Sequence, residues 1–317
     1  EYHMSESIGS GVAIFDSNND GLLDIYFLNG PGRQESSSKN VRRTNELFVQ
    51  KNKNTFENRT EYSGLGSSQF SMGVAVGDID NDGYQDVYCS NLGPDQLFLN
   101  NGDGTFEDIA AQAGVENLRF TKAVVWGDYN NDGFSDLFLS NLGQPNRLYH
   151  NNGDGTLTDV APQLAVETPT LSFPAWFWDY DNDGNLDIFA SSYDGKTQDQ
   201  ARHLLGKPGK YEPARLYRGD GKGGFTDTAA AVGLDFPMLP MGSNFGDLDG
   251  DGFLDFYLGT GDPEYASIMP NLMLLGRGGD RFVDVTMAGG FGHLQKGHAI
   301  AFADIDRDGD VLSLIHI

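Results

Sequence analysis

The chain has 317 residues and carries 46 acidic against 21 basic side chains, which gives a formal net charge of −25. So large an excess of acid excludes a nucleic-acid groove and a broad contact with an anionic membrane, because both require basic surface. The one cysteine, Cys89, excludes an intramolecular disulfide and a cysteine-based metal site, and we expect it to be buried on a strand.

No apolar run reaches the roughly 18 residues that a membrane-spanning helix needs, so we expect no membrane insertion. The chain starts at Glu1 without a signal-like segment, and we expect a fragment or a mature form whose targeting segment is missing. The 42 glycines, with many Asn, Asp, Phe and Tyr residues, are typical of short strands joined by tight turns.

Six acidic stretches align with one another and recur about every 50 to 70 residues, a spacing typical of repeat architectures. They read DSNNDGLLD from Asp16, DIDNDGYQD from Asp78, DYNNDGFSD from Asp128, DYDNDGNLD from Asp179, DLDGDGFLD from Asp247 and DIDRDGDVL from Asp304. The sixth stretch is incomplete, because Leu312 stands where the others have their last Asp.

Each complete stretch lies between two apolar runs, as in GVAVGD before and DVYCSN after the second one. A third apolar segment follows, then a turn such as NNGDGT at 100–105 and a fourth segment such as TFEDIA. Asn-Gly and Asp-Gly supply the positive φ angles of tight hairpins, and four short antiparallel strands make one propeller blade. We find no apolar residues at helical spacing over ten or more positions.

The predicted fold is therefore all-β, an incomplete β-propeller of four-stranded antiparallel blades with metal-binding hairpin loops. We place five blades at about 8–62, 70–116, 120–166, 171–234 and 240–290, and the first strand of a sixth at 297–311. Residues 312–317, LSLIHI, break the repeat in mid-loop, and we expect them to be a non-native tail; a divergent natural end is the alternative.

The acidic loops have the pattern of a calcium site: Asp at position 1, Asp or Asn at 3, Asp at 5, Gly at 6 and Asp at 9. Oxygen atoms at positions 1, 3, 5 and 9, with the backbone carbonyl of position 7, suit a hard cation of the size of Ca²⁺. The candidate ligands are Asp16, Asn18, Asp20, Leu22 and Asp24; Asp78, Asp80, Asp82, Tyr84 and Asp86; Asp128, Asn130, Asp132, Phe134 and Asp136; Asp179, Asp181, Asp183, Asn185 and Asp187; Asp247, Asp249, Asp251, Phe253 and Asp255; and Asp304, Asp306 and Asp308 in the truncated sixth loop.

An EF-hand begins in the same way but needs Glu at position 12 and a helix on each side. Position 12 is instead Phe27, Cys89, Leu139, Ala190 and Leu258, each within an expected strand. The loops could also be polar turns that bind nothing, but six in register favour about five complete Ca²⁺ sites and a truncated sixth.

The stretch 73–115 resembles the FG-GAP or VCBS repeat of integrin-α-type propellers, and more narrowly the repeats of the cartilage acidic protein and ASPIC/UnbV family. The paired signatures GDxDNDGxxD and NNGDGTFxD carry the resemblance, which runs from about Gly9 to Asp310. It implies a calcium-binding propeller, usually exported, that serves recognition or adhesion and precedes an ASPIC/UnbV module. That module does not occur in this sequence, and we expect the last blades of the propeller to be missing as well. The Gly-Ala-Pro of the FG-GAP name is also missing, so an integrin-like role is not implied.

Length varies among the connections between second and third strands, at the end of each blade opposite the acidic loops. The long ones are 31–45, 192–213 and 261–271, and the first two hold many of the scarce cations. Because binding often resides in long loops on a rigid scaffold, we predict a protein or glycan partner at this face, although tolerated surface insertions are the alternative. An Arg-Gly-Asp tripeptide at 218–220 falls in a third-to-fourth-strand turn, and we interpret it as part of that turn.

These patterns favour a non-enzymatic, calcium-binding recognition module that is secreted, periplasmic or on the cell surface. Two alternatives remain open: a polysaccharide lyase or hydrolase built on a calcium-stabilised propeller, and a passive spacer in a larger surface protein.

Overall fold

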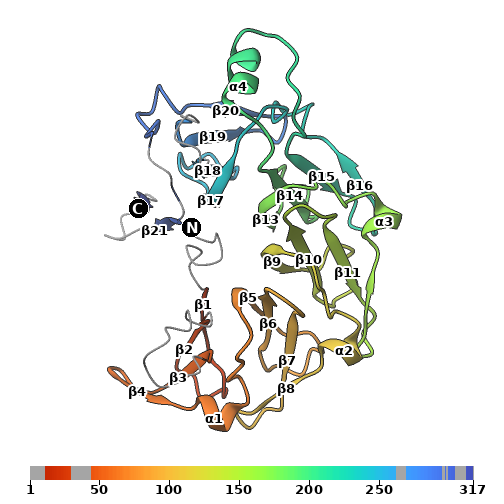
Figure 1. Ribbon diagram of the computed structural model, residues 1–317, viewed down its shortest axis with the longest axis vertical. Helices are drawn as coiled ribbons and strands as arrows, with labels where there is room; N and C mark the ends of the chain where they lie inside the picture. The colour runs from red at the N-terminus through yellow and green to blue at the C-terminus, as the bar shows by residue number, and fades with distance from the viewer. Residues whose placement is uncertain are drawn as a thin grey trace, which may run out of the picture. The chain divides into compact units, whose positions relative to one another are not determined.

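The computed structural model describes residues 11–29, 44–261, 269–294, 297 and 299–303, and the backbone of 312–316. This part of the chain forms five sheets of four antiparallel strands and one two-stranded sheet, each from strands that are consecutive in sequence (Figure 1). The prediction of an all-β, propeller-like fold is thus confirmed. Asp304, Asp306 and Asp308, and most of the connection 31–45, lie outside the described residues.

The strands have the order that the repeats predict. The first sheet comprises β1 (Val12–Phe15), β2 (Asp24–Phe27), β3 (Glu46–Asn52) and β4 (Thr55–Asn58). The second comprises β5 (Ser71–Gly77), β6 (Asp86–Asn91), β7 (Gln96–Asn100) and β8 (Phe106–Asp108). The third comprises β9 (Thr121–Gly127), β10 (Asp136–Asn141), β11 (Arg147–Asn151) and β12 (Leu157–Asp159). The fourth comprises β13 (Ser172–Trp178), β14 (Asp187–Ser192), β15 (Arg215–Gly219) and β16 (Phe225–Asp227). The fifth comprises β17 (Pro240–Gly246), β18 (Asp255–Thr260), β19 (Leu272–Arg277) and β20 (Arg281–Asp284), and the two-stranded sheet β21 (Ala299–Ala303) and β22 (Leu312–His316).

The chain divides into two compact units, which are described separately. The first comprises Glu1–Asp128, Asp132–Leu139 and Arg147–Val160, and the second comprises Tyr129–Asn131, Ser140–Asn146 and Ala161–Ile317. In the first unit the opening strands β1, β5 and β9 lie side by side, and in the second β13, β17 and β21 do so. Gly77 at the end of β5 permits this approach, because a Cβ there would lie 3.0 Å from the ring of Trp126 on β9.

The second strand of a sheet is its most buried one, as the near-continuous apolar runs predict for strands covered on both faces. Every residue of β6, β14 and β18 is buried. Cys89 lies on β6 with no exposed surface, and burial raises the pKa of its thiol to about 12. The expectation that this cysteine is a small, buried side chain on a strand is confirmed.

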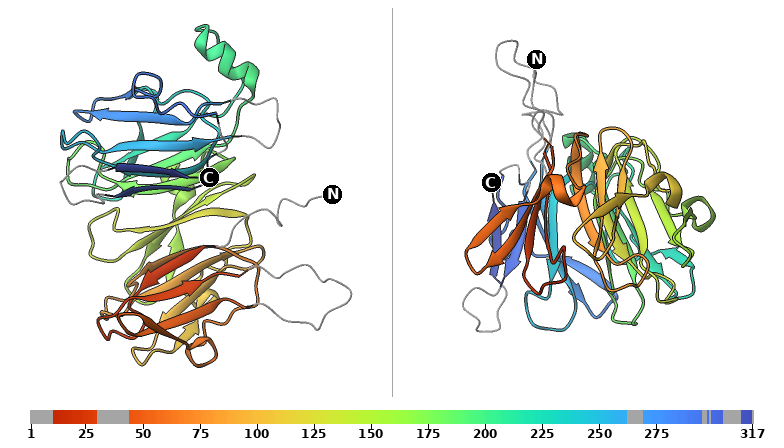
Figure 2. Two further views of the ribbon diagram at one scale, coloured as in Figure 1. Left: turned by 90° about the vertical axis from the view of Figure 1, so that its left-hand side faces the viewer. Right: turned by 90° about the horizontal axis from the view of Figure 1, so that it is seen from below.

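The structure adds helices that the sequence patterns do not predict. Three four-residue helices follow the fourth strands of the first three sheets: α1 (Thr60–Ser63), α2 (Ala110–Ala113) and α3 (Ala161–Leu164). The longest, α4 (Thr197–Leu204), lies in the connection 192–213 and extends beyond the sheets of its own unit (Figure 2). Single helical turns carry no periodic apolar signal, which explains why pattern analysis missed them.

At the end of the chain, β22 (Leu312–His316) pairs antiparallel with β21, with Ile300 opposite Ile315. The segment expected to be a non-native tail thus forms a strand in the structure. No helix among the described residues is long and apolar enough to span a membrane.

A buried Asn or Asp side chain recurs at the position just before the third strand of a sheet. Asn45, Asn146 and Asn271 each accept a backbone N–H from the chain leaving the second strand, and in the second sheet Asp95 replaces them. Asp95 also accepts from the Tyr88 hydroxyl at 3.0 Å and is 1% exposed. Burial raises the pKa of Asp95 to about 7, so its ionised form destabilises the fold.

Replacing Asp95 with Asn is therefore expected to be more favourable for stability at pH 8 than near pH 4, where the variant loses the bond that Asn117 Nδ2 donates to Asp95 Oδ2 at 2.9 Å. A carboxyl whose folded-state pKa is raised stabilises the fold below its unfolded value of about 4, and this contribution is lost as the pH rises through about 7. A shift of three units corresponds to at most about 4 kcal/mol, and we expect about half of that. Urea unfolding at both pH values measures the difference. The reciprocal Asn45→Asp variant should lose stability at pH 8, and equal effects at the two pH values would contradict the assignment.

Candidate metal centres

The five complete acidic stretches form the hairpin loops between the first and second strands of the five sheets, as predicted. We number them loop 1 (16–24), loop 2 (78–86), loop 3 (128–136), loop 4 (179–187) and loop 5 (247–255). In loop 4, Asp179 accepts the N–H groups of Asp183 at 3.0 Å and Gly184 at 2.9 Å. Gly184 has a φ of 85°, which favours glycine at position 6. Asp183 in turn accepts the N–H of Asn185 at 2.9 Å.

Position 4 of the loop also has a role, and the sequence analysis missed it. Asn19, Asn81, Asn131 and Asn182 all have φ between 56° and 59°, a left-handed conformation that Asn tolerates better than most residues. Two of these side chains reach the next loop: Asn81 donates to the carbonyl of Gly133, and Asn182 to that of Gly252, both at 2.8 Å. The recurrence of Asn at position 4 in four loops was the available signal.

The Asp at position 9 is a structural residue as well as a candidate ligand. In loop 2, Asp86 is 1% exposed and accepts the N–H of Ile79 at 2.9 Å and that of Asn100 at 2.8 Å. Asp24, Asp187 and Asp255 make the same two bonds to the loop and to the third strand. This carboxylate therefore ties the loop to both neighbouring strands.

Three loops bring together carboxylate oxygens at the spacing of a metal site. The clusters are Asp78, Asp80 and Asp86 in loop 2, Asp179, Asp181 and Asp187 in loop 4, and Asp247, Asp249 and Asp251 in loop 5, and in each the oxygens lie within 4.8 Å of one another. Loops 1 and 3 have Asn18 and Asn130 at position 3 and so offer fewer carboxylates. The predicted ligands of the second, fourth and fifth loops thus converge in part.

The donor set fits a hard divalent cation. Asp78 Oδ1 in loop 2 and Asp181 Oδ1 in loop 4 are buried and have no hydrogen-bond partner, although buried acceptors are normally satisfied. A cation among all-oxygen donors would complete them, and several carboxylates at this spacing match the ligands that Ca²⁺ takes. The carbonyls predicted as ligands at position 7, those of Leu22, Tyr84, Phe134, Asn185 and Phe253, stay a prediction.

The electrostatics of the loops also favour a bound cation. Burial raises the pKa of Asp86 and Asp187 to about 7 and that of Asp255 to about 6. Partial burial, and then repulsion from Asp82 and Asp78, also raises the pKa of Asp80. Loops 2, 4 and 5 therefore hold negative charge at a cost that a bound cation would relieve.

Two arginines contact the fourth and fifth loops. Arg218 Nε lies 2.5 Å from Asp181 Oδ2 and its Nη2 lies 2.8 Å from Asp183 Oδ2. Arg277 Nη1 lies 2.7 Å from both Asp249 Oδ2 and Asp251 Oδ2. In the third loop, His150 Nδ1 lies 3.1 Å from Asp136 Oδ1. Arg218, the first residue of the Arg-Gly-Asp tripeptide, is thus engaged within its own sheet, in accordance with the structural interpretation of that turn.

The turns between third and fourth strands lie at the same end of the sheets as the acidic loops, as predicted. A Cβ on Gly102 would lie 2.9 Å from the Tyr84 ring, and one on Gly153 would lie 2.8 Å from the Phe134 ring. The second-to-third-strand connections, including 192–213, therefore leave the opposite end.

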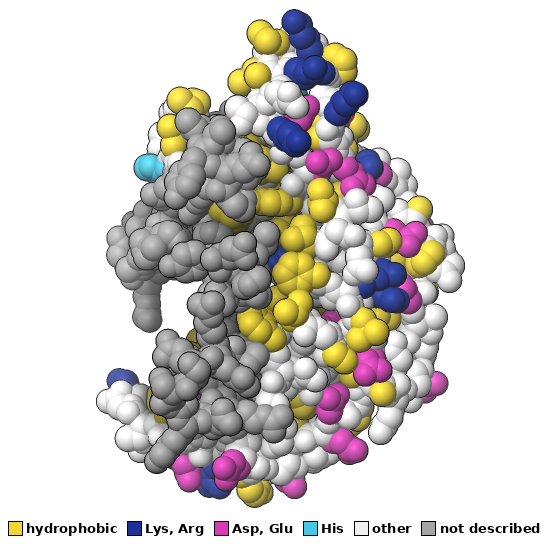
Figure 3. Space-filling model, viewed as in Figure 1, with side chains coloured by type: hydrophobic (Ala, Val, Ile, Leu, Met, Phe, Trp, Pro, Cys, Tyr) yellow, Lys and Arg dark blue, Asp and Glu magenta, His cyan; other side chains and the backbone are white. Residues whose placement is uncertain are grey.

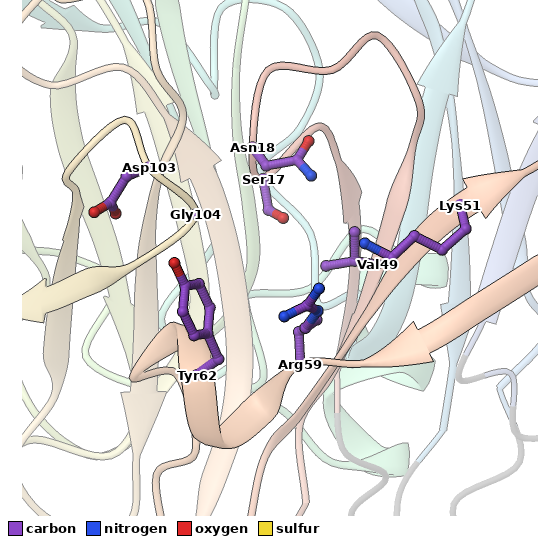
Figure 4. A pocket seen from close by; sticks show the side chains of 8 residues that line it. All are labelled: Ser17, Asn18, Val49, Lys51, Arg59, Tyr62, Asp103 and Gly104. Atoms are coloured by element: carbon purple, nitrogen blue, oxygen red, sulfur yellow. The ribbon is translucent and has the colours of Figure 1, made fainter.

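A cavity of about 190 Å³ lies beside the first acidic loop, lined in part by Asn18, Asp103 and the 59%-exposed ring of Tyr62 (Figure 4). Two cations also line it, but both are paired with Glu57: Lys51 Nζ lies 3.2 Å and Arg59 Nε 3.1 Å from its carboxylate. Both cations are therefore held by one carboxylate within the first sheet.

In the connection 192–213, unlike at the cavity, the basic side chains are not held by any acid that the structure describes. They gather around α4 (Figure 3). Lys196, Arg202, Lys207 and Lys210 are exposed, and among the described residues none of them forms an ion pair. Two of its three acids accept backbone N–H groups within the segment: Asp199 is 4% exposed and takes the N–H of Lys210, and Asp194 takes that of Glu212. With four Lys and Arg residues against three acids, the segment has a formal net charge of +1 on an acidic protein.

Comparison with solved structures supports the fold. The chain is similar to an Agrocybe aegerita lectin whose structure concerns recognition of non-reducing terminal N-acetylglucosamine, with 16% identity, a TM-score of 0.54, and coverage of 98% of this chain and 75% of the lectin. It also resembles the V. cholerae biofilm matrix protein Bap1, with 14% identity, a TM-score of 0.47, and coverage of 93% of this chain and 41% of that one. At such identities only the first likeness bears on the fold, and neither bears on function.

A search of curated proteins finds no significant match. Comparison with protein families matches the FG-GAP-like repeat four times, over residues 16–89, 78–139, 128–190 and 179–258. Each match begins at one acidic loop and ends on the second strand of the following sheet, so the family repeat and the structural repeat coincide. The chain therefore belongs to the FG-GAP-like repeat family.

Proposed function

We propose that this chain is a calcium-stabilised, non-enzymatic recognition module that acts outside the cytoplasm. The observation that carries the proposal is loop 2, where three carboxylates converge and Asp78 Oδ1 is buried without a partner. When bound, Ca²⁺ would neutralise the carboxylates and cross-link the two strands of each hairpin. The side chains of Asp78, Asp80 and Asp86 would hold it in loop 2, and the equivalent residues would do so in the other loops.

The proposed partner is a glycan or protein that binds at the connection 192–213. The cations around α4, which form no ion pair among the described residues, and the exposed Leu204 and Leu205, at 83% and 69%, support this surface over the cavity beside Tyr62, whose cations both pair with Glu57. Secretion, a periplasmic or cell-surface location, and the narrower cartilage acidic protein or ASPIC/UnbV assignment belong to the same proposal.

A glycan array in millimolar calcium, followed by a turnover assay on each hit, tests this function. Replacing 192–213 with a tight turn should abolish binding and leave the calcium dependence of melting intact. The triple variant Arg202→Gln, Lys207→Gln and Lys210→Gln should weaken binding, whereas Lys53→Gln, Lys222→Gln and Arg281→Gln together remove the same charge elsewhere and should not. Retained binding without 192–213 would refute the surface, and turnover of a bound glycan would refute the non-enzymatic role.

A further inference from the structure

The acidic loops differ in one neighbour that the third strand supplies. Phe98 pairs with Val87 in the second sheet and Tyr217 pairs with Ile188 in the fourth, so the next residues, Leu99 and Arg218, hold equivalent positions. The fourth sheet therefore presents a cation to its acidic loop where the second presents an aliphatic side chain. The fifth sheet supplies its cation, Arg277, from the end of β19.

Both arginines bind the carboxylates at positions 3 and 5 of their loops. Arg218 spans Asp181 and Asp183, with contacts of 2.5 and 2.8 Å. Arg277 lies 2.7 Å from one oxygen of each corresponding carboxylate, those of Asp249 and Asp251. These are the same side chains that a cation in the loop would need, so the guanidinium and the ion compete for shared oxygens.

Loop 2 has the same carboxylates without this competitor. Asp80 and Asp82 form no ion pair among the described residues, and Asp78 Oδ1 has no partner. Asp80, Asp78 and Asp86 nevertheless offer oxygens within 4.8 Å of one another. No cationic side chain among the described residues therefore compensates the repulsion within this loop.

We infer that Arg218 and Arg277 are internal counter-ions that weaken calcium binding at loops 4 and 5, so that loop 2 is the tightest calcium site among the five described loops. This inference rests on the proposed calcium function and divides the repeats into two classes. Hairpins with an arginine are neutralised by the protein itself, whereas the loop 2 hairpin depends on an ion. To load loop 4 or 5, Ca²⁺ must displace the guanidinium or bind beside it, and both options reduce affinity through competition or like-charge repulsion.

An ordinary surface ion pair would have no such coupling to calcium. Arg215 on the same strand as Arg218 provides the comparison, because it pairs with Asp227 at 2.9 Å, away from the acidic loop. Arg215→Leu and Arg218→Leu therefore remove the same charge from the same strand. Only the second changes the charge at a candidate ion site.

Titration of the whole chain with calcium, followed by calorimetry and by terbium luminescence, tests the inference. Arg218→Leu and Arg277→Leu should each raise the affinity of one site by about tenfold, whereas Arg215→Leu should leave the isotherm unchanged. Leu99→Arg is the reciprocal variant, and it should weaken calcium binding at loop 2 by a similar factor. It tests the inference even if Arg218→Leu or Arg277→Leu does not fold.

The outcomes separate the two proposals. Calcium uptake by the wild-type chain with identical isotherms for Arg218→Leu and Arg215→Leu, or with an unaltered tight site in Leu99→Arg, would overturn the counter-ion role and leave the proposed function standing. No uptake of either ion by folded wild-type protein would overturn the proposed function and the inference with it.

Discussion

Removal of divalent cations is expected to lower the melting temperature of the chain by about 10 °C or more. A site with a Kd of about 10⁻⁴ M contributes roughly 2.7 kcal/mol in about 10 mM calcium, so two or three loaded loops contribute about 5 to 8 kcal/mol. For a chain of this size each kcal/mol shifts the midpoint by about 2 °C or slightly more. Circular dichroism melts in chelator and in calcium measure the change.

Two controls separate a bound ion from general screening of a chain with a net charge of −25. Sodium chloride at the ionic strength of the calcium buffer should restore only a small part of the stability, because screening does not supply ligand bonds. Magnesium should restore less than calcium, since it retains more of its water. A midpoint that responds equally to all three salts would contradict ion binding in the loops.

Replacing Asp86 with Ala is expected to destabilise the chain by about 3 to 5 kcal/mol even in the presence of chelator. The substitution leaves the buried N–H groups of Ile79 and Asn100 without acceptors, and each such loss costs about 1 to 3 kcal/mol. Asp80→Asn is the matched variant, because Asp80 is an exposed candidate ligand at position 3 and the amide oxygen of Asn can still accept the N–H of Asp82.

Urea unfolding of both variants, with and without calcium, distinguishes the two roles of the loop. Asp86→Ala should lose stability in both buffers, whereas Asp80→Asn should lose it only where calcium is present. If Asp86→Ala matched the wild type in chelator, the bonds from this carboxylate to the backbone would not contribute to stability.

Much of the fold was predictable because the signals are local and repeated. Gly at position 6, with the apolar runs on either side, identified each acidic stretch as a hairpin between the first and second strands, and the structure has these hairpins at every described repeat. The NNGDGT turns were equally clear, since Asn-Gly and Asp-Gly adopt few other conformations. Helix α4 was not predictable, because eight residues in a connection carry too little periodicity.

The residues of the candidate site could be predicted from the sequence, but their hydrogen-bond and ion-pair partners could not. Spacing indicates that Asp86 and its equivalents are candidate ligands, but it does not show that they also accept N–H groups from the third strand, whose donor lies 14 residues after Asp86 and 32 residues after Asp187. Likewise, the sequence predicts Arg218 only as the start of a turn. Its contact with Asp183 depends on the register of β14 and β15. Such contacts follow from strand pairing and cannot be read from a motif.

The strict order of strands within each sheet has a consequence for biosynthesis. Each sheet pairs only strands that follow one another along the chain, so its backbone bonds require no segment translated later. Short-range pairing of this kind forms quickly and allows segments to fold as they emerge from the ribosome. Nascent chains arrested after residue 160 should accordingly already protect the amides of β6 and β7 from hydrogen exchange.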